Sequence, residues 1–72
     1  MKIIKAGEVI AELRDKPKDF DGTSKGGTVW VVASDAEVKL AHYADVKRAH
    51  EVLHAIHEAY FAGEEKFIMP EE

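Results

Sequence analysis

The sequence predicts a small α+β protein in which a mainly antiparallel sheet of four to five strands is packed by one helix. Residues 28–33 are mostly β-branched or aromatic, and residues 37–42 alternate between polar and apolar, as expected of two paired strands. Residues 45–62 repeat their apolar side chains at the spacing of one helix face. Strand segments that precede a single helical segment are typical of an α+β fold.

The chain is expected to form one domain, residues 1–72, because 72 residues leave no room for a second core. A chain of this size buries only about 60% of the surface that its unfolded form exposes. The sequence contains no cysteine, which excludes disulfides and thiolate metal sites. Self-association is the remaining common source of stability, so we expect a homodimer or a higher oligomer.

Residues 1–14 are expected to form a hairpin. Lys2–Lys5 has the composition of a short strand, and Ala6-Gly7 provides a turn into a second strand at Glu8–Leu13. The apolar residues of this second stretch also fall at helical spacing. Strand and helix therefore both remain open for residues 6–14.

Residues 15–27 are expected to form a flexible loop. They contain Pro17, which lacks a backbone donor, and the turn signals Asp21-Gly22 and Gly26-Gly27. The glycines do not follow the order of a phosphate-binding loop, and a strand comes next where such a loop opens a helix. Phosphate binding is therefore not expected here.

Residues 28–43 are expected to form an antiparallel hairpin that turns at Ser34-Asp35-Ala36. The first arm of this hairpin is apolar on both faces. It should therefore lie in the centre of the sheet or against a partner chain.

The helix is expected to span residues 45–62. Asp45 is the expected N-cap, and Gly63 is expected to end the helix because glycine readily adopts a positive φ. Residues 66–69 are expected to add an edge strand that Pro70 terminates. The apolar stripe that should face the core consists of Ala49, Val52, Leu53, Ile56 and Tyr60.

Four residues are candidates for ligand binding. Trp30 and Tyr43 could stack on a planar ligand. Lys47 and Arg48 lie in the first turn of the predicted helix, where positive charge opposes the helix dipole. That arrangement points to an anionic contact, so a small anionic ligand is the expected occupant.

His50, His54, His57 and Phe61 form a second group, which falls on one side of the predicted helix beside the core stripe. One small sheet is too narrow to cover both the stripe and this band. Exposed aromatic and imidazole groups of this kind are typical of a contact surface. We therefore expect these four residues to form the interface of the oligomer.

The segment His50-Glu51-Val52-Leu53-His54 matches the zincin motif H-E-x-x-H. A zincin also needs a third ligand, a substrate cleft and a glutamate aimed into that cleft. At about 100° per residue, Glu51 falls on the solvent side of the helix. We therefore expect no metal, no cofactor and no catalytic residue. Zinc binding stays an alternative.

The formal net charge of −4 argues against direct nucleic-acid binding, which calls for a basic surface. Apolar runs near the N-terminus, such as Ile3-Ile4, are short and soon followed by charges, so no secretory segment is expected. No stretch is long and apolar enough to span a membrane. A cytoplasmic protein without membrane partners is expected.

The carboxyl-terminal half, about residues 37–70, resembles a group of small proteins common in phages and prophages of Gram-positive bacteria. In these proteins a strand ends in aliphatic-x-x-Tyr, a polar residue caps a helix, and a glycine precedes an aromatic-x-Met-Pro ending. The resemblance implies a counter-defence factor of the host-cell cytoplasm that sequesters a cyclic nucleotide signal or blocks a host protein. The matching residues are Leu40, Tyr43, Asp45, Ala49, Leu53, Ile56, Gly63, Phe67, Met69 and Pro70.

The function that follows from these observations is non-catalytic binding by a homo-oligomer. Its expected partners are a second copy of the chain, together with a small anionic ligand or a host protein. Two alternatives stay open. One is a zinc-binding protein or minimal zincin-like hydrolase built on His50-Glu51-x-x-His54, and the other is a structural or regulatory interaction module.

Overall fold

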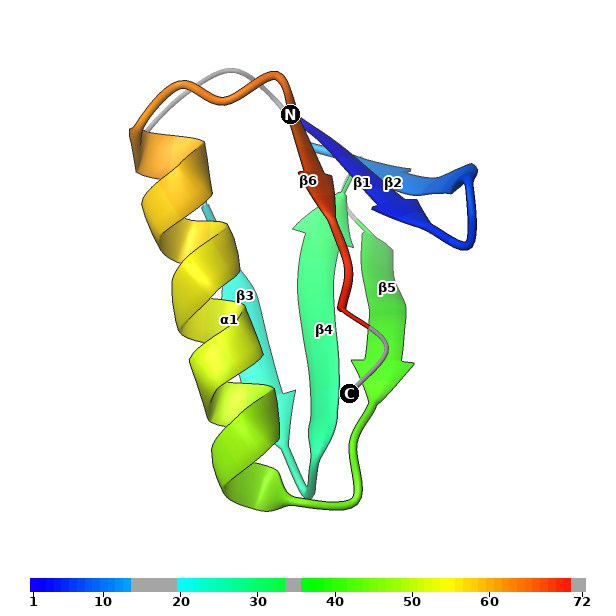
Figure 1. The fold of residues 1–72 in the computed structure, drawn as a ribbon, viewed down its shortest axis with the longest axis vertical. Helices are drawn as coiled ribbons and strands as arrows, with labels where there is room; N and C mark the ends of the chain where they lie inside the picture. Colours follow the sequence, from blue (N-terminus) through cyan, green and yellow to red (C-terminus); the bar gives the residue numbers. More distant parts are fainter. Residues whose placement is uncertain (14–19, 34–35, 71–72) are drawn as a thin grey trace.

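The computed structural model describes residues 1–13, 20–33 and 36–70. This part of the chain confirms the α+β class, with one helix packed against two small sheets (Figure 1). The described residues form six strands in two sheets, where four to five strands in a single sheet were expected. Sheet A has the order β2-β1-β6 and sheet B the order β3-β4-β5. The elements are β1 (Lys2–Lys5), β2 (Glu8–Glu12), β3 (Gly22–Lys25), β4 (Thr28–Ala33), β5 (Ala36–His42), α1 (Val46–Phe61) and β6 (Lys66–Ile68).

Two tight turns set up the antiparallel hairpins of the fold. Ala6 and Gly7 have φ values of 53° and 79°, and Gly26 and Gly27 have values of 58° and 85°. Positive φ at both central residues is the mark of the type I′ turn, whose twist suits a two-residue hairpin. The N-terminal hairpin is therefore confirmed, and residues 8–12 form a strand rather than a helix. At Gly27 a Cβ would also collide with the carbonyl oxygen of Tyr43.

The predicted loop at 15–27 is wrong for its last part, because residues 22–25 form β3. The glycine turn after β3 folds these small polar residues back onto β4, where they pair antiparallel with Thr28–Val31. Pairing with a strongly β-forming neighbour thus overrides their weak intrinsic preference. The earlier part of the predicted loop, residues 15–19, lies outside the described residues.

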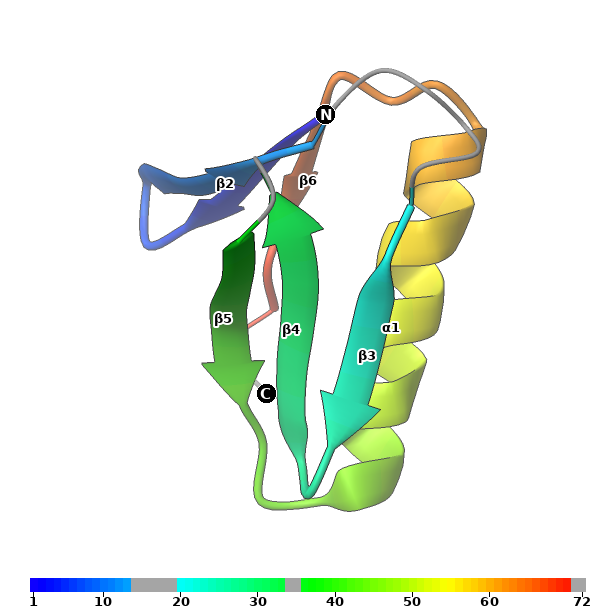
Figure 2. The same ribbon diagram turned by 180° about the vertical axis from the view of Figure 1, so that it is seen from behind.

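Strand β4 lies in the centre of sheet B, as expected of a strand that is apolar on both faces. Val29 and Val31 are buried towards the helix, whereas Trp30 is half-buried on the other face. Figure 2 shows that outer face of sheet B, with β3 next to the helix and β4 and β5 further from it. In β5 a register shift opposite Val29 and Trp30 lets both Leu40 and Ala41 reach the core.

The helix begins and ends as the sequence predicts. The Asp45 carboxylate accepts a hydrogen bond from the N–H of Lys47 at 2.9 Å. At the other end of the helix, Gly63 has a φ of 80°. The N–H of Gly63 donates to the carbonyl oxygen of Tyr60, and the N–H of Glu64 donates to the carbonyl oxygen of Ala59. These two bonds form a Schellman motif, which satisfies carbonyls that would otherwise lack partners. The buried face of α1 consists of Ala49, Val52, Ile56 and Tyr60.

Strand β6 confirms the predicted edge strand, although its last residue is Ile68. It pairs with β1 in parallel and leaves its other edge without a strand among the described residues. The chain after β6 is held inside the fold, because Met69 is buried and the Tyr43 hydroxyl donates to the carbonyl of Pro70 at 2.7 Å. Sheet A and the helix therefore share one core with the inner face of sheet B.

Candidate functional site

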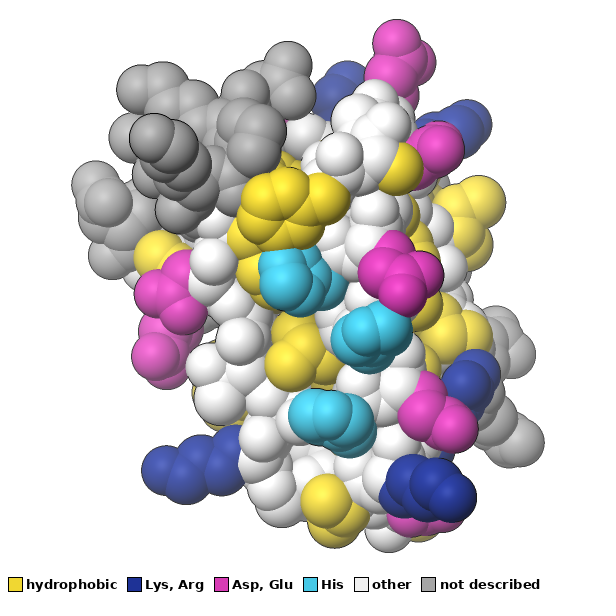
Figure 3. Space-filling view, turned by 90° about the vertical axis from the view of Figure 1, so that its left-hand side faces the viewer, with side chains coloured by type: hydrophobic (Ala, Val, Ile, Leu, Met, Phe, Trp, Pro, Cys, Tyr) yellow, Lys and Arg dark blue, Asp and Glu magenta, His cyan; other side chains and the backbone are white. Residues whose placement is uncertain are grey.

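One side of α1 carries the strongest concentration of exposed aromatic and imidazole groups. His50, His54, His57 and Phe61, the histidine flank, are all exposed. Figure 3 shows the three imidazoles in a row along the helix, next to a hydrophobic patch. Spacings of four, three and four residues place these side chains on the same side of a helix. The four residues predicted for an interface thus form one continuous surface.

Phe20 joins this surface from the segment that leads into β3. Its ring stacks on His57 at a centroid distance of 4.7 Å and an angle of 10°. His57 in turn meets the edge of Phe61 at 4.7 Å. Phe20 also contacts Tyr60, at 5.3 Å, and so connects the exposed flank to the core. The sequence analysis missed Phe20. The available signal was that it is the only aromatic residue in the predicted loop at 15–27.

A shallow hollow of about 300 Å³ lies on the same surface, between α1 and the start of β3. Gly22 lets the start of β3 pack closely against the side chains of Leu53 and Phe20 at this point. A Cβ at this position would lie 2.8 Å from the Leu53 side chain and 2.9 Å from the ring of Phe20. Phe61 does not line the hollow and is 52% exposed further along the helix. The residues that line the hollow are Phe20, Asp21, Gly22, His50, Leu53, His54 and His57.

The zincin-like motif lies on this flank but lacks the arrangement of a metal centre. The carboxylate of Glu51 lies 3.8 Å from the guanidinium of Arg48, on the preceding turn of the helix. His54 Nδ1 lies 3.3 Å from the carboxylate of Glu58. Among residues 1–13, 20–33 and 36–70, no cluster of three or more His, Cys, Asp or Glu side chains is arranged to hold a metal ion. His50 and His54 alone would leave a tetrahedral zinc ion half-liganded.

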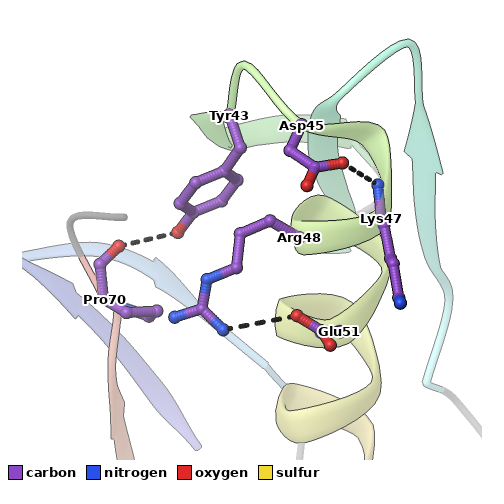
Figure 4. A network of polar contacts seen from close by, with 6 residues as sticks. All are labelled: Tyr43, Asp45, Lys47, Arg48, Glu51 and Pro70. Carbon is purple, nitrogen blue, oxygen red and sulfur yellow. Dashed lines mark hydrogen bonds and ion pairs between the residues drawn. The ribbon is translucent and has the colours of Figure 1, made fainter.

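The four residues predicted for ligand binding do not come together. Trp30 lies on the outer face of sheet B, opposite Lys39 of β5. Tyr43 is only 5% exposed and lies in the core with its hydroxyl against Pro70 (Figure 4). Burial raises the pKa of the Tyr43 hydroxyl, and the nearby Arg48 guanidinium partly offsets that rise. Arg48 thus lies near a buried structural tyrosine, whereas the Lys47 side chain points away from that tyrosine (Figure 4).

Comparisons with known proteins identify no relative: the sequence matches no protein-family model, no curated protein and no solved structure. The resemblance to small phage proteins therefore stays an expectation. Within the described part of the chain, no helix has the length and hydrophobicity needed to cross a membrane.

Proposed function

We propose that the protein is a non-catalytic binding module that acts as a homo-oligomer, with the histidine flank as its self-association surface. The proposal rests on one observation: a protruding aromatic side chain and a hollow lie on the same flank. Phe61 protrudes from one end, and the hollow walled by Phe20 and Leu53 lies further back along the helix. In a dimer whose two-fold axis passes through this flank, Phe61 of each copy would lie against the hollow of the other copy. The two contacts would then be identical, as they are in every isologous interface.

The chemistry of the flank suits a contact surface. Aromatic side chains add large apolar area at low entropic cost, and burying an exposed phenylalanine contributes roughly 1.5–3 kcal/mol. The imidazoles carry both apolar surface and hydrogen-bonding atoms, which suits the rim of an interface. Glu51 and His54 have their charged partners on neighbouring turns of the same helix, so contact is a better role for this face than catalysis.

Sequestration of one ligand by the four predicted residues is not part of this function. Trp30 lies on the outer face of sheet B and Tyr43 lies in the core, so a single small molecule would not reach both. Self-association requires neither residue.

The test is the mass of the protein in solution, measured by sedimentation equilibrium at micromolar concentration. We expect the wild type to sediment as a dimer or larger and Phe61→Glu to shift towards the 8.0 kDa monomer. The substitution buries a charge in the proposed contact, which costs several kcal/mol if it stays unpaired. Val9→Glu is the matched control, because Val9 is 54% exposed on the remote N-terminal hairpin.

Circular dichroism establishes that each variant is folded. A wild type that sediments as a single 8.0 kDa species would refute the proposal. An equal loss of mass in Val9→Glu and Phe61→Glu would also contradict it, since the effect would then not belong to the histidine flank.

A further inference from the structure

The opposite side of α1 forms one wall of a second, larger depression. Ala55, Ala59 and Ala62, the alanine flank, face β6 across an open groove of about 640 Å³. In Figure 1, β6 lies beside the carboxyl-terminal part of α1, and both elements contribute residues to the lining of the groove. Small side chains on the helix leave this space unfilled. The residues that line it are Ala55, Glu58, Ala59, Ala62, Glu64, Lys66, Phe67 and Ile68.

The strand wall of this groove carries backbone groups without strand partners. On the β1 side, the Glu65 carbonyl accepts from Lys2 and the Met69 N–H donates to Ile4. Backbone groups alternate between the two edges of a strand. Those of Phe67 therefore also point to β1, whereas those of Lys66 and Ile68 point to the free edge. That edge is unpaired within the described part of the fold.

We propose that this groove binds an extended peptide segment of a partner protein, which adds to sheet A as a strand beside β6. The backbone of another extended chain is the only common ligand whose N–H and C=O groups have the same spacing as those along a strand edge. The alanine flank then provides room for alternate side chains of the peptide, and apolar ones fit it because Phe67 and Ile68 also line the groove. Ile68 is 66% exposed and gains most from being covered.

Charge adds a preference for a basic residue in the peptide. Two carboxylates, Glu58 and Glu64, border the groove against one ammonium, Lys66. Glu58 also faces His54, so Glu64 is the freer of the two carboxylates. The formal net charge of −4 on the whole chain attracts the same kind of partner over longer range.

The short length of β6 limits indiscriminate pairing. Short edge strands that carry lysine are a common protection against aggregation. An edge of Lys66–Ile68 offers few hydrogen bonds, so a partner also has to match the groove with its side chains. Binding at this site is therefore expected to be selective and of modest affinity.

The experiment uses a displayed library of random peptides, each of about ten residues, selected on the full-length protein. We expect enrichment of peptides that alternate apolar residues and carry lysine or arginine. Nuclear magnetic resonance with one enriched synthetic peptide should then shift the amide signals of Lys66 and Ile68. N-methylation of the peptide residues that face β6 should abolish binding, whereas methylation of the intervening residues should change the Kd by no more than about twofold.

Two variants of the protein, each with a control, test separately the two walls of the groove, the edge of β6 and the alanine flank. Ile68→Pro removes one N–H from the free edge without touching the ladder to β1, and should raise the Kd about tenfold. Ile68→Val keeps the N–H and is its control. Ala59→Leu fills the groove from the helix side and should weaken binding as well. Ala44→Leu adds the same bulk at an exposed position before the start of α1, outside the groove, and should not.

Three results would overturn the proposal. One is a selection that enriches no peptide, and another is binding that is insensitive to N-methylation. The third is an Ile68→Pro variant that converts an oligomeric wild type to monomer, because a second copy of β6 would then occupy the edge. Self-association through the histidine flank is tested independently by Phe61→Glu, which should leave peptide binding intact, so the two proposals fail or succeed separately.

Discussion

The two flanks of α1 share one helix and one buried stripe, yet they differ in how they meet the sheets. On the histidine flank, Phe20 packs onto His57 and Tyr60 and leaves only the smaller hollow beside the start of β3. On the alanine flank, small side chains leave a groove beside the free edge of β6. Large side chains thus create a surface for side-chain packing, whereas small ones leave backbone within reach of a partner.

The comparison predicts that stability depends more on the histidine flank than on the alanine flank. Phe20→Ala should lower the free energy of unfolding by about 2 kcal/mol, roughly half the cost at a fully buried phenylalanine. The reason is that Phe20 is half-buried and packs against the core as well as against His57. Chemical denaturation followed by circular dichroism measures the change.

The corresponding substitution in the groove beside the alanine flank is Ile68→Ala. Ile68 is 66% exposed, so its truncation should change stability by less than about 0.5 kcal/mol. If the two substitutions cost the same, Phe20 would not anchor its flank and the contrast between the flanks would be lost.

Local signals in the sequence were sufficient for most of the fold. Asp45 and Gly63 bound the helix because capping depends on a few neighbouring backbone groups. A turn at Ala6-Gly7 was expected from composition, although helix stayed open there, and the central place of β4 was one of two expected positions. The division into two sheets did not, because the parallel pairing of β6 with β1 joins the two ends of the chain.

The candidate site was predictable to the extent that it lies on one helix. The spacing of His50, His54, His57 and Phe61 is a local property, so the flank appears as expected. Phe20 comes from a distant segment, and no periodicity connects it to the helix. Trp30 and Tyr43 were grouped by chemistry, but the side of the sheet that each faces is decided by register and by the shift in β5.

A second prediction concerns the β6 side of the molecule and its dependence on pH. Tyr43→Phe removes the hydrogen bond to Pro70 and should cost about 1 kcal/mol at neutral pH. Burial raises the pKa of Tyr43 above its ordinary value of 10.0, so the ionised phenolate is disfavoured in the folded protein. The contribution of Tyr43 to the free energy of unfolding is therefore fully present below about pH 10, and it declines as the pH rises through the raised pKa.

Denaturation curves of wild type and Tyr43→Phe, measured from pH 8 to the alkaline limit, isolate this effect. The gap between the two proteins should be constant up to about pH 10 and narrow above it, because only the wild type loses the contribution of Tyr43. A gap that widens in alkali would mean that ionisation of Tyr43 favours the fold. Because Pro70 lies two residues after the end of β6, peptide binding in the groove should also weaken in this variant, whereas the mass in solution should not change.

The smallest expected effect concerns the ion pair that connects His54 of the histidine flank with Glu58 at the border of the groove. His54 and Glu58 are 3.3 Å apart, but their side chains are 66% and 71% exposed, and the pair is ionic only when His54 is protonated. Exposed pairs at this helical spacing contribute about 0.3–0.5 kcal/mol. A double-mutant cycle of His54→Ala and Glu58→Gln should therefore give a coupling energy below about 0.5 kcal/mol. A small value means that the flanks can be altered independently, as separate tests of self-association and peptide binding require. A coupling well above about 1 kcal/mol would mean that Glu58 transmits changes from the histidine flank to the groove.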